Sequence, residues 1–229
     1  DYWTGPLSQG PAETTWENCN TYDKHFITVQ DEIRLFDAWF TAGMEDAANG
    51  TNLQSELFQD YEIPDIIKEW PAHGDITQGQ DYYLAPFFDR NEDGEYRWED
   101  GDYPWHDIYK TKACETDRTV SLYGDLNYWW VMNDKGNIHT ETGADPIGME
   151  IRAQAFAFSS NDEINNMTFY QYQIINQSSI SLNDCYFGQW VDADDNSTLD
   201  VLNPVNQEII GRVPNCGATE TNVAILAAA

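Results

Sequence analysis

The run from Asp89 to Asp100 constrains this chain more than any other feature of its sequence. Side chains with oxygen atoms stand at alternate positions, a glycine follows the third of them, and an acid closes the run. Loops with this spacing fold around Ca2+, with side-chain ligands at positions one, three and five, a backbone carbonyl at seven and an acid at twelve. The alternative is a solvated acidic turn. The sequence predicts a Ca2+ site made by Asp89, Asn91, Asp93, the carbonyl of Glu95, and Asp100.

The residues after this loop decide what kind of calcium loop it is. Gly101 and Pro104 follow Asp100 almost at once, and they exclude the exiting helix of an EF-hand. The likeness to an EF-hand is therefore limited to ligand spacing. Without that second helix there is no element to swing open when the ion binds. We expect a fixed calcium staple rather than a sensor.

A second candidate metal site begins at Asp192. Asp194 and Asn196 continue the alternation of oxygen side chains directly after an expected strand. No glycine stands at the bend, so an acidic loop at the end of a strand is the alternative. The polar run 161–166 is predicted to be a turn whose side chains bond the backbone.

The net charge of the chain limits the kinds of partner that it is expected to bind. The chain has 40 acidic and 11 basic residues and a net charge of −29. Nucleic acid and anionic membrane surfaces both require basic patches, so neither is expected as a partner. No apolar run approaches the roughly 20 residues of a membrane span, so direct membrane insertion is not expected either. The acidity serves solubility alone, or it is neutralised by several divalent cations.

The cysteines and histidines give no catalytic signature. The four cysteines are well separated, which leaves up to two disulfides or buried free thiols open: Cys19, Cys114, Cys185 and Cys216. Three histidines have acids nearby, but their spacing matches no zinc motif, so structural hydrogen bonds are expected: His73, His106 and His139. No nucleophile elbow or P-loop is present. The sequence favours a protein that is not an enzyme, although a glycosidase-like carboxylate pair stays open.

Hydrophobic spacing predicts helices first and strands later. One stripe recurs at intervals of three and four, which predicts one or two helices ending at Gly43: Tyr22, Phe26, Val29, Ile33, Phe36 and Phe40. Residues 45–60 are predicted to be a loop, and a short helix is expected over 64–70. Beyond residue 120, strands are expected over 127–132, 150–159, 167–177 and 184–192, the last two pairing as a hairpin.

These patterns together predict a mainly β fold. It would be an antiparallel β-sandwich with an N-terminal helical annex and long metal-stabilised loops. Residues 1–120 would form the annex with the calcium loop, and residues 121–229 the sandwich region. Five tryptophans could either stack on sugars or fill the core, and the core is the stronger interpretation: Trp98, Trp105, Trp129, Trp130 and Trp190.

Seven stretches, in order along the chain, carry a resemblance to known proteins. They are DYWTGPL (1–7), WPAHGD (70–75), LAPFFDRNEDGEY (84–96), EDGDYP (99–104), WWVMNDKGNIHTETG (129–143), NDEINNMTFY (161–170) and GQWVDAD (188–194). These stretches resemble large secreted proteins of Bacteroidota that typically end in a type IX secretion (Por) sorting domain. The resemblance implies export to the cell surface or medium and an origin inside a longer precursor. It implies no activity, and it ends after Asp194.

The expected function is a non-catalytic, calcium-stabilised structural or interaction module of a secreted cell-surface protein or assembly. Its expected partners are other subunits or domains of the longer precursor, with surface glycans as a further option. A carbohydrate-binding or adhesive module is the first alternative, marked by surface aromatics in a row. A secreted hydrolase is the second, and it would require polar residues converging in a cleft.

Overall fold

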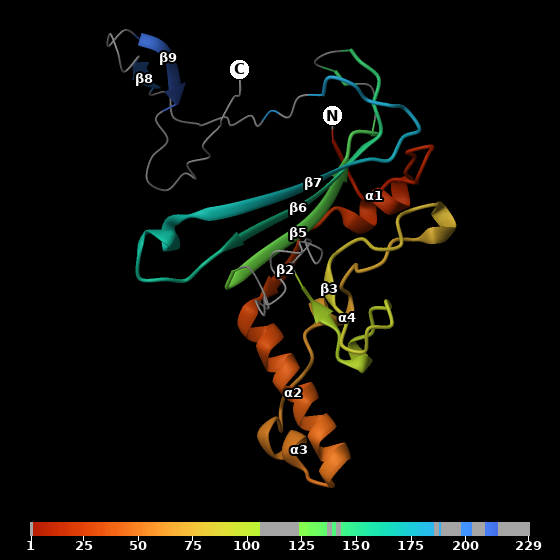
Figure 1. Ribbon diagram of the computed structural model, residues 1–229, viewed down its shortest axis with the longest axis vertical. Helices are drawn as coiled ribbons and strands as arrows, with labels where there is room; N and C mark the ends of the chain where they lie inside the picture. The colour runs from red at the N-terminus through yellow and green to blue at the C-terminus, as the bar shows by residue number, and fades with distance from the viewer. Residues whose placement is uncertain are drawn as a thin grey trace. The chain divides into compact units, whose positions relative to one another are not determined.

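A computed structural model describes residues 2–105, 124–136, 139–140, 143–185, 188, 198–202 and 209–214. The chain divides into two compact units, Asp1–Ser159 with Phe169–Ile180, and Ser160–Thr168 with Ser181–Ala229. Helices and strands contribute almost equally to the described residues. The expected antiparallel sheets are present, but the fold is mixed rather than mainly β (Figure 1). The predicted boundary at residue 120 lies outside the described residues.

The first unit is built on a five-stranded sheet with β5 (Leu126–Asn133) inside it. β6 (Met149–Ala157) pairs antiparallel with β5 along its whole length, and β7 (Thr168–Asn176) lies beyond β6. The opposite edge of β5 takes two short strands from the beginning of the chain, β1 (Trp3–Thr4) and β2 (Phe26–Val29). The expected strands at 127–132, 150–159 and 167–177 are therefore confirmed.

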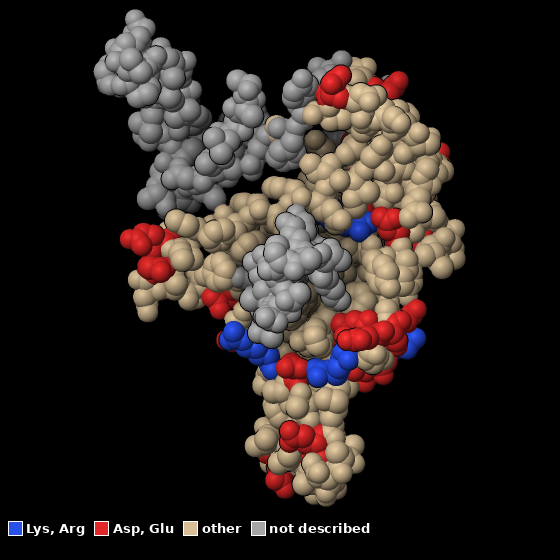
Figure 2. Space-filling view, viewed as in Figure 1, with Lys and Arg blue, Asp and Glu red and all other residues tan. Residues whose placement is uncertain are grey.

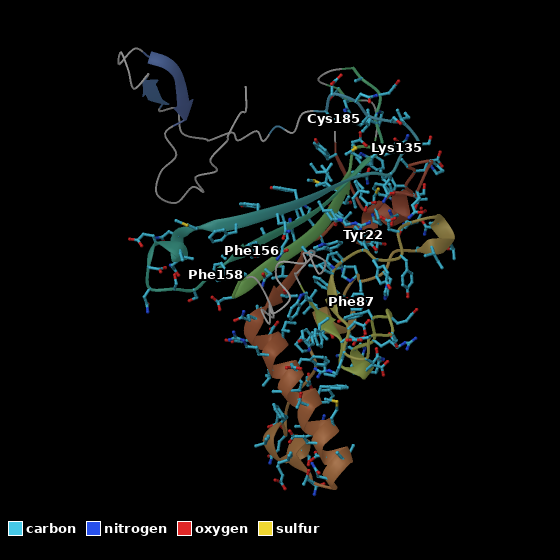
Figure 3. All side chains as sticks on the ribbon, viewed as in Figure 1. Tyr22, Phe87, Lys135, Phe156, Phe158 and Cys185 are labelled. Atoms are coloured by element: carbon cyan, nitrogen blue, oxygen red, sulfur yellow. The ribbon has the colours of Figure 1, made fainter. Side chains whose placement is uncertain are left out.

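The two faces of this sheet differ. On the inner face, Trp129 and Val131 of β5 are buried opposite Gln154 and Arg152 of β6. Side chains alternate along β6, so Ile151 and the alanines point the other way, to the outer face. At the end of β6, Phe156 and Phe158 remain half-buried (Figure 3) and pack with Phe169 of β7.

The predicted helical stripe is wrong in its middle. α1 (Trp16–Tyr22) begins after Thr15, whose Oγ1 accepts a hydrogen bond from the Asn18 N–H at 3.2 Å. Phe26 and Val29 then lie in β2, where pairing with β5 and burial of Phe26 override the helical spacing. α2 (Gln30–Asn49) starts only afterwards.

The predicted end of the helix at Gly43 and the predicted loop over 45–60 are also wrong. α2 continues to Gly50, which has a φ of 67° and donates its N–H to the Asp46 carbonyl. α3 (Leu53–Leu57) follows, and Asp46 Oδ1 and Oδ2 accept the N–H groups of Leu53 and Gln54. Gly43 is needed for a different reason: a Cβ there would lie 2.6 Å from the Gln54 amide nitrogen. Its small size lets α3 approach α2.

Short elements then carry the chain across the inner face. They are α4 (Asp65–Lys68), η1 (Ile76–Gln78), β3 (Phe87–Phe88), η2 (Trp98–Asp100) and β4 (Tyr103–Pro104). One core cluster joins this region to the sheet through Trp70, Phe87 and Trp129. A second joins Ile33 and Phe36 of α2 to Tyr103. The helix expected over 64–70 is confirmed.

The second unit contains η3 (Glu163–Asn166) and the antiparallel pair β8 (Thr198–Leu202) and β9 (Ile209–Pro214). The Asp162 side chain accepts the Ile164 N–H at 3.1 Å, so the turn expected over 161–166 is confirmed. The hairpin expected between 167–177 and 184–192 falls largely outside the described residues. No helix in the described ranges is both long and apolar enough to cross a bilayer.

Candidate functional site: the acidic loop between β3 and β4

The acidic loop is closed at its base by the pairing of β3 with β4. Phe87 stands opposite Pro104, and Phe88 stands opposite Tyr103, on which its ring stacks at 4.7 Å. In Figure 2 acidic side chains gather over the part of the surface where Figure 1 places β3 and the loop after it, with basic atoms among them. The loop is therefore a charged segment that extends from a base of aromatic residues.

A buried carboxylate that the sequence reasoning missed holds the two sides of the loop together. Asp102 has no exposed surface; its Oδ1 accepts the Arg90 N–H and its Oδ2 accepts the Arg97 N–H, each at 2.9 Å. Burial raises the pKa of the Asp102 carboxyl, two backbone hydrogen bonds oppose this, and the charges of Asp89 and Asp93 raise it further. The sequence signal for this role is an acid directly after Gly101. In that segment Gly101 and Pro104 predict only the absence of an exiting helix.

The first three predicted ligands converge at the tip of the loop. Asp89 accepts the N–H groups of Asp93 at 3.2 Å and Gly94 at 2.8 Å, and Asn91 Oδ1 accepts the Asp93 N–H at 3.1 Å. Asp93 Oδ1 accepts the Glu95 N–H at 2.8 Å, and this bond is the largest cause that lowers the pKa of Asp93. The chain turns sharply at Gly94, the glycine that follows the third of these side chains, with a φ of 82°.

The other predicted side-chain ligand, Asp100, lies beside a cation that belongs to the protein. The Arg97 guanidinium lies 3.4 Å from Asp93, 3.6 Å from Asp100 and 3.7 Å from Glu95. Asp100 therefore pairs with Arg97 in the structure. Within the described residues, no group of three or more His, Cys, Asp or Glu side chains is arranged to hold a metal ion.

The loop is anchored to α2 by Arg90. Its guanidinium pairs with Asp37 and lies 5.1 Å from the centre of the Phe40 ring, and its Nε donates to the Gly101 carbonyl at 3.3 Å. Gly101 has a φ of 91°, and a Cβ there would lie 2.5 Å from the Phe40 ring. Only glycine fits this conformation and this space.

His73 and His139 both have structural roles. His73 Nε2 accepts the Tyr96 N–H at 2.8 Å, so its Nδ1 carries the proton and donates to the Tyr82 carbonyl at 3.2 Å. His139 Nε2 lies 3.1 Å from the Asp134 carbonyl. The expectation of hydrogen-bonded structural histidines is confirmed for both, and His106 lies outside the described residues.

Two hollows adjoin the loop and share the exposed ring of Tyr83. One has a volume of about 350 Å3, and Phe87, Asp89 and Arg152 are among its lining residues. The other, of about 640 Å3, is lined by Tyr83, Phe88, Asp89, Glu92, Asp93 and Gly94. The side chains of Asp89 and Asp93 thus stand at the surface of open space.

Behind the first hollow lies a buried group of charges. The Arg152 guanidinium donates to Glu150 at 2.7 Å, to Asp81 at 2.5 Å and to the Tyr83 carbonyl at 2.9 Å. Glu150 also accepts the Leu7 N–H at 2.8 Å. Because these residues come from distant parts of the chain, their contacts fix the segment before the acidic loop against the sheet.

Other predicted sites have mixed outcomes. The second metal site, Asp192, Asp194 and Asn196, lies outside the described residues, as do Cys114, Cys216 and Trp190. Cys19 and Cys185 are free thiols. Trp129 is a core residue and Trp98 and Trp105 pack against the second cluster, so the core interpretation is confirmed for these three.

Comparison with known proteins adds one short similarity. No family model matches the chain, and no solved structure matches it significantly. A stretch of 41 residues is 58% identical to a glutarate-semialdehyde dehydrogenase of Pseudomonas aeruginosa and 51% identical to that of Pseudomonas putida. It is 54% identical to a succinate semialdehyde dehydrogenase of Acinetobacter baylyi. The stretch is 18% of this chain and 8% of each dehydrogenase, which is too little to define a family.

Proposed function

We propose that this chain is a non-catalytic, calcium-stabilised module of a secreted cell-surface protein, with Ca2+ held by the loop between β3 and β4. The observation that carries the proposal is the convergence of Asp89, Asn91 and Asp93 on the backbone of residues 93–95. Those hydrogen bonds pre-orient the oxygens of positions one, three and five beside an open hollow. Little further ordering would be needed to bind a hard cation there.

Electrostatics supports a bound cation. Residues 89–102 contain seven acids and two arginines, a net charge of −5. Asp102 adds a buried carboxylate whose pKa is raised by burial and then by Asp89 and Asp93. A divalent ion would relieve this repulsion, and its binding free energy would become folding free energy.

Binding of Ca2+ would require Arg97 to move away from the carboxylates that it now contacts. Its guanidinium occupies the side of the loop where Asp93 and Asp100 would meet the ion. Arg97 is half-exposed on a long flexible side chain, so it can turn into solvent at small cost. Arg97 and Ca2+ are then alternative partners of the same carboxylates.

The wider assignment has three parts. The resemblance to type IX secreted proteins of Bacteroidota supports a cell-surface or extracellular location and partners within a longer precursor. The acidic composition supports a partner other than nucleic acid. The β-sandwich is also proposed: a second sheet would complete the cover of Phe156, Phe158 and Phe169.

Calorimetry with Ca2+ and with EDTA tests the calcium proposal. At a Ca2+ concentration of 100 times Kd the ion adds about 2.7 kcal/mol, which raises Tm by roughly 5–10 °C for a chain of this size. Asp89→Asn with Asp93→Asn should abolish the shift, whereas Asp65→Asn, an exposed acid elsewhere, should leave it unchanged. Arg97→Met should enlarge it. An identical Tm in Ca2+ and EDTA for the unmodified protein would remove the basis of the proposal.

A further inference from the structure

The hollow of about 350 Å3 beside the acidic loop has an aromatic side and a polar side. Tyr83, which is 57% exposed, and Phe87 of β3 (Figure 3) form the aromatic side, and their rings stack at 6.4 Å. Arg152 of β6 and Gln173 of β7 line the hollow from the sheet, and Asp89 lines it from the loop. Its volume lies at the lower end of the range for small-molecule pockets. The hollow therefore has the size and the mixed lining of a ligand site.

The backbone between the two aromatic rings is held in place by hydrogen bonds. The Leu84 N–H donates to the Ala72 carbonyl at 2.8 Å, and the Pro86 carbonyl accepts the indole N–H of Trp70 at 3.0 Å. Leu84, Ala72 and Trp70 are themselves buried in the core. This side of the hollow is therefore formed before a ligand binds, which lowers the ordering cost of binding.

The polar side offers both donors and acceptors. The buried Arg152 guanidinium uses three of its five N–H groups on Glu150, Asp81 and the Tyr83 carbonyl. Among the described residues, none accepts its other two N–H groups, and none bonds the exposed amide of Gln173. The Asp89 carboxylate accepts two backbone N–H groups and has lone pairs left for further donors.

The charges around the hollow disfavour a simple ion as its ligand. An anion would meet the Asp89 carboxylate, whereas the positive charge of Arg152 is already paired with Glu150 and Asp81. An ammonium group would suit Asp89, but it has no acceptor for the remaining N–H groups of Arg152 and Gln173. The lining therefore calls for a neutral ligand that combines an apolar face with groups that both donate and accept.

We propose that this hollow binds a neutral hexose ring. A hexose has a C–H face that can lie on the exposed ring of Tyr83, and its neighbouring hydroxyl groups can each accept from Arg152 or Gln173 and donate to Asp89. A free monosaccharide and the end of a glycan chain share this chemistry. Of the residues that line the hollow, only Asp89 and Gly94 belong to the calcium loop, so this inference does not rest on bound Ca2+.

Isothermal titration calorimetry with methyl glucoside, methyl galactoside and methyl mannoside tests the proposal. The methyl glycoside of glucuronic acid is the anionic control, and that of glucosamine is the cationic control. We expect saturable binding of at least one neutral glycoside with a Kd of about 1–10 mM, and weaker binding of both charged probes. Disaccharides that end in the same hexose distinguish the two sources: tighter binding indicates a glycan end, and equal binding indicates the free sugar.

Two variants place the binding in the hollow. Tyr83→Ala removes the ring but keeps the backbone carbonyl that holds Arg152, and it should weaken binding about tenfold or more. Gln173→Glu keeps the size of the side chain but removes its N–H donors, so it should weaken binding as well. Tyr2→Ala removes a tyrosine ring that is 67% exposed outside the hollow, and it should change nothing.

Three results would overturn the proposal. The first is that no neutral glycoside binds with a Kd below roughly 50 mM. The second is that a charged probe binds more tightly than its neutral counterpart. The third is that the Tyr83 and Gln173 variants bind as tightly as the unmodified protein while circular dichroism shows them to be folded.

Discussion

Replacing Arg152 by methionine should destabilise the protein by about 3–5 kcal/mol, the cost of breaking a buried ion pair by removing one partner. The Arg152 side chain is 9% exposed, and it is the guanidinium bonded to both Glu150, which is fully buried, and Asp81. Methionine keeps most of the volume but leaves two carboxylates to be held by neutral donors. Gln177 and the Leu7 N–H are such donors, and neither carries a compensating charge.

Urea unfolding followed by tryptophan fluorescence measures this cost, because Trp129 is a core residue of the same sheet face. Arg34→Met is the matched control: Arg34 pairs with Asp31 at 3.9 Å on the surface of α2, where both side chains are largely exposed. Its loss should cost about 0–1 kcal/mol. Adding Glu150→Gln to Arg152→Met should recover part of the stability, because one unpaired charge is then removed. If the variants at 152 and 34 lose stability equally, the buried charges are not held as described.

Gly101→Ala should destabilise by about 1–3 kcal/mol from backbone strain alone and by more because of the contact with Phe40. Gly10→Ala has a similar φ of 85° with no atom within 4 Å, so it should show the strain only; equal losses of stability would refute the contact. For Asp81, burial raises the pKa, but hydrogen bonds from Gln9 and Gln177 and the charge of Arg152 lower it more, to below 3.8. Its ionised form therefore stabilises the fold above pH 3.8 and loses this effect as pH falls through the lowered pKa, so the stability difference between the protein and Asp81→Asn should vanish in acid. A difference that stays constant from pH 7 to pH 3 would contradict this linkage.

The sequence predicts the strands of the sheet well because their signal is local. Alternation along 150–159 places Arg152 and Gln154 on the face opposite Ile151, and the first two are buried whereas Ile151 is partly exposed. The helices before residue 50 are harder to predict from sequence. Phe26 continues a helical spacing by coincidence, whereas it lies in a strand because it pairs with β5, about 100 residues later. Gly43 led to a wrong prediction of the helix end. A glycine is needed there because α3 packs closely against α2, and local spacing does not encode that packing.

The acidic loop was predictable in part. The turn at Gly94 and the convergence of Asp89, Asn91 and Asp93 follow from short spacings. The role of Arg97 as an internal cation and that of Asp102 as a brace depend on how the loop closes, and β3 and β4 decide this.

The placement of β1 and β2 on the same edge of β5 has a consequence for folding. Thr4 stands opposite Met132, and Phe26 stands opposite Trp129, so both pairings join segments separated by more than 100 residues. Forming contacts between residues so far apart in the sequence closes a large loop of the chain. The entropy cost of closing that loop comes before the contacts add any stability, so such contacts slow folding. On a ribosome or in an export channel, the first strands would wait for most of the first unit to emerge. Until then their edges stay open, and a holding partner would protect the chain best during that interval.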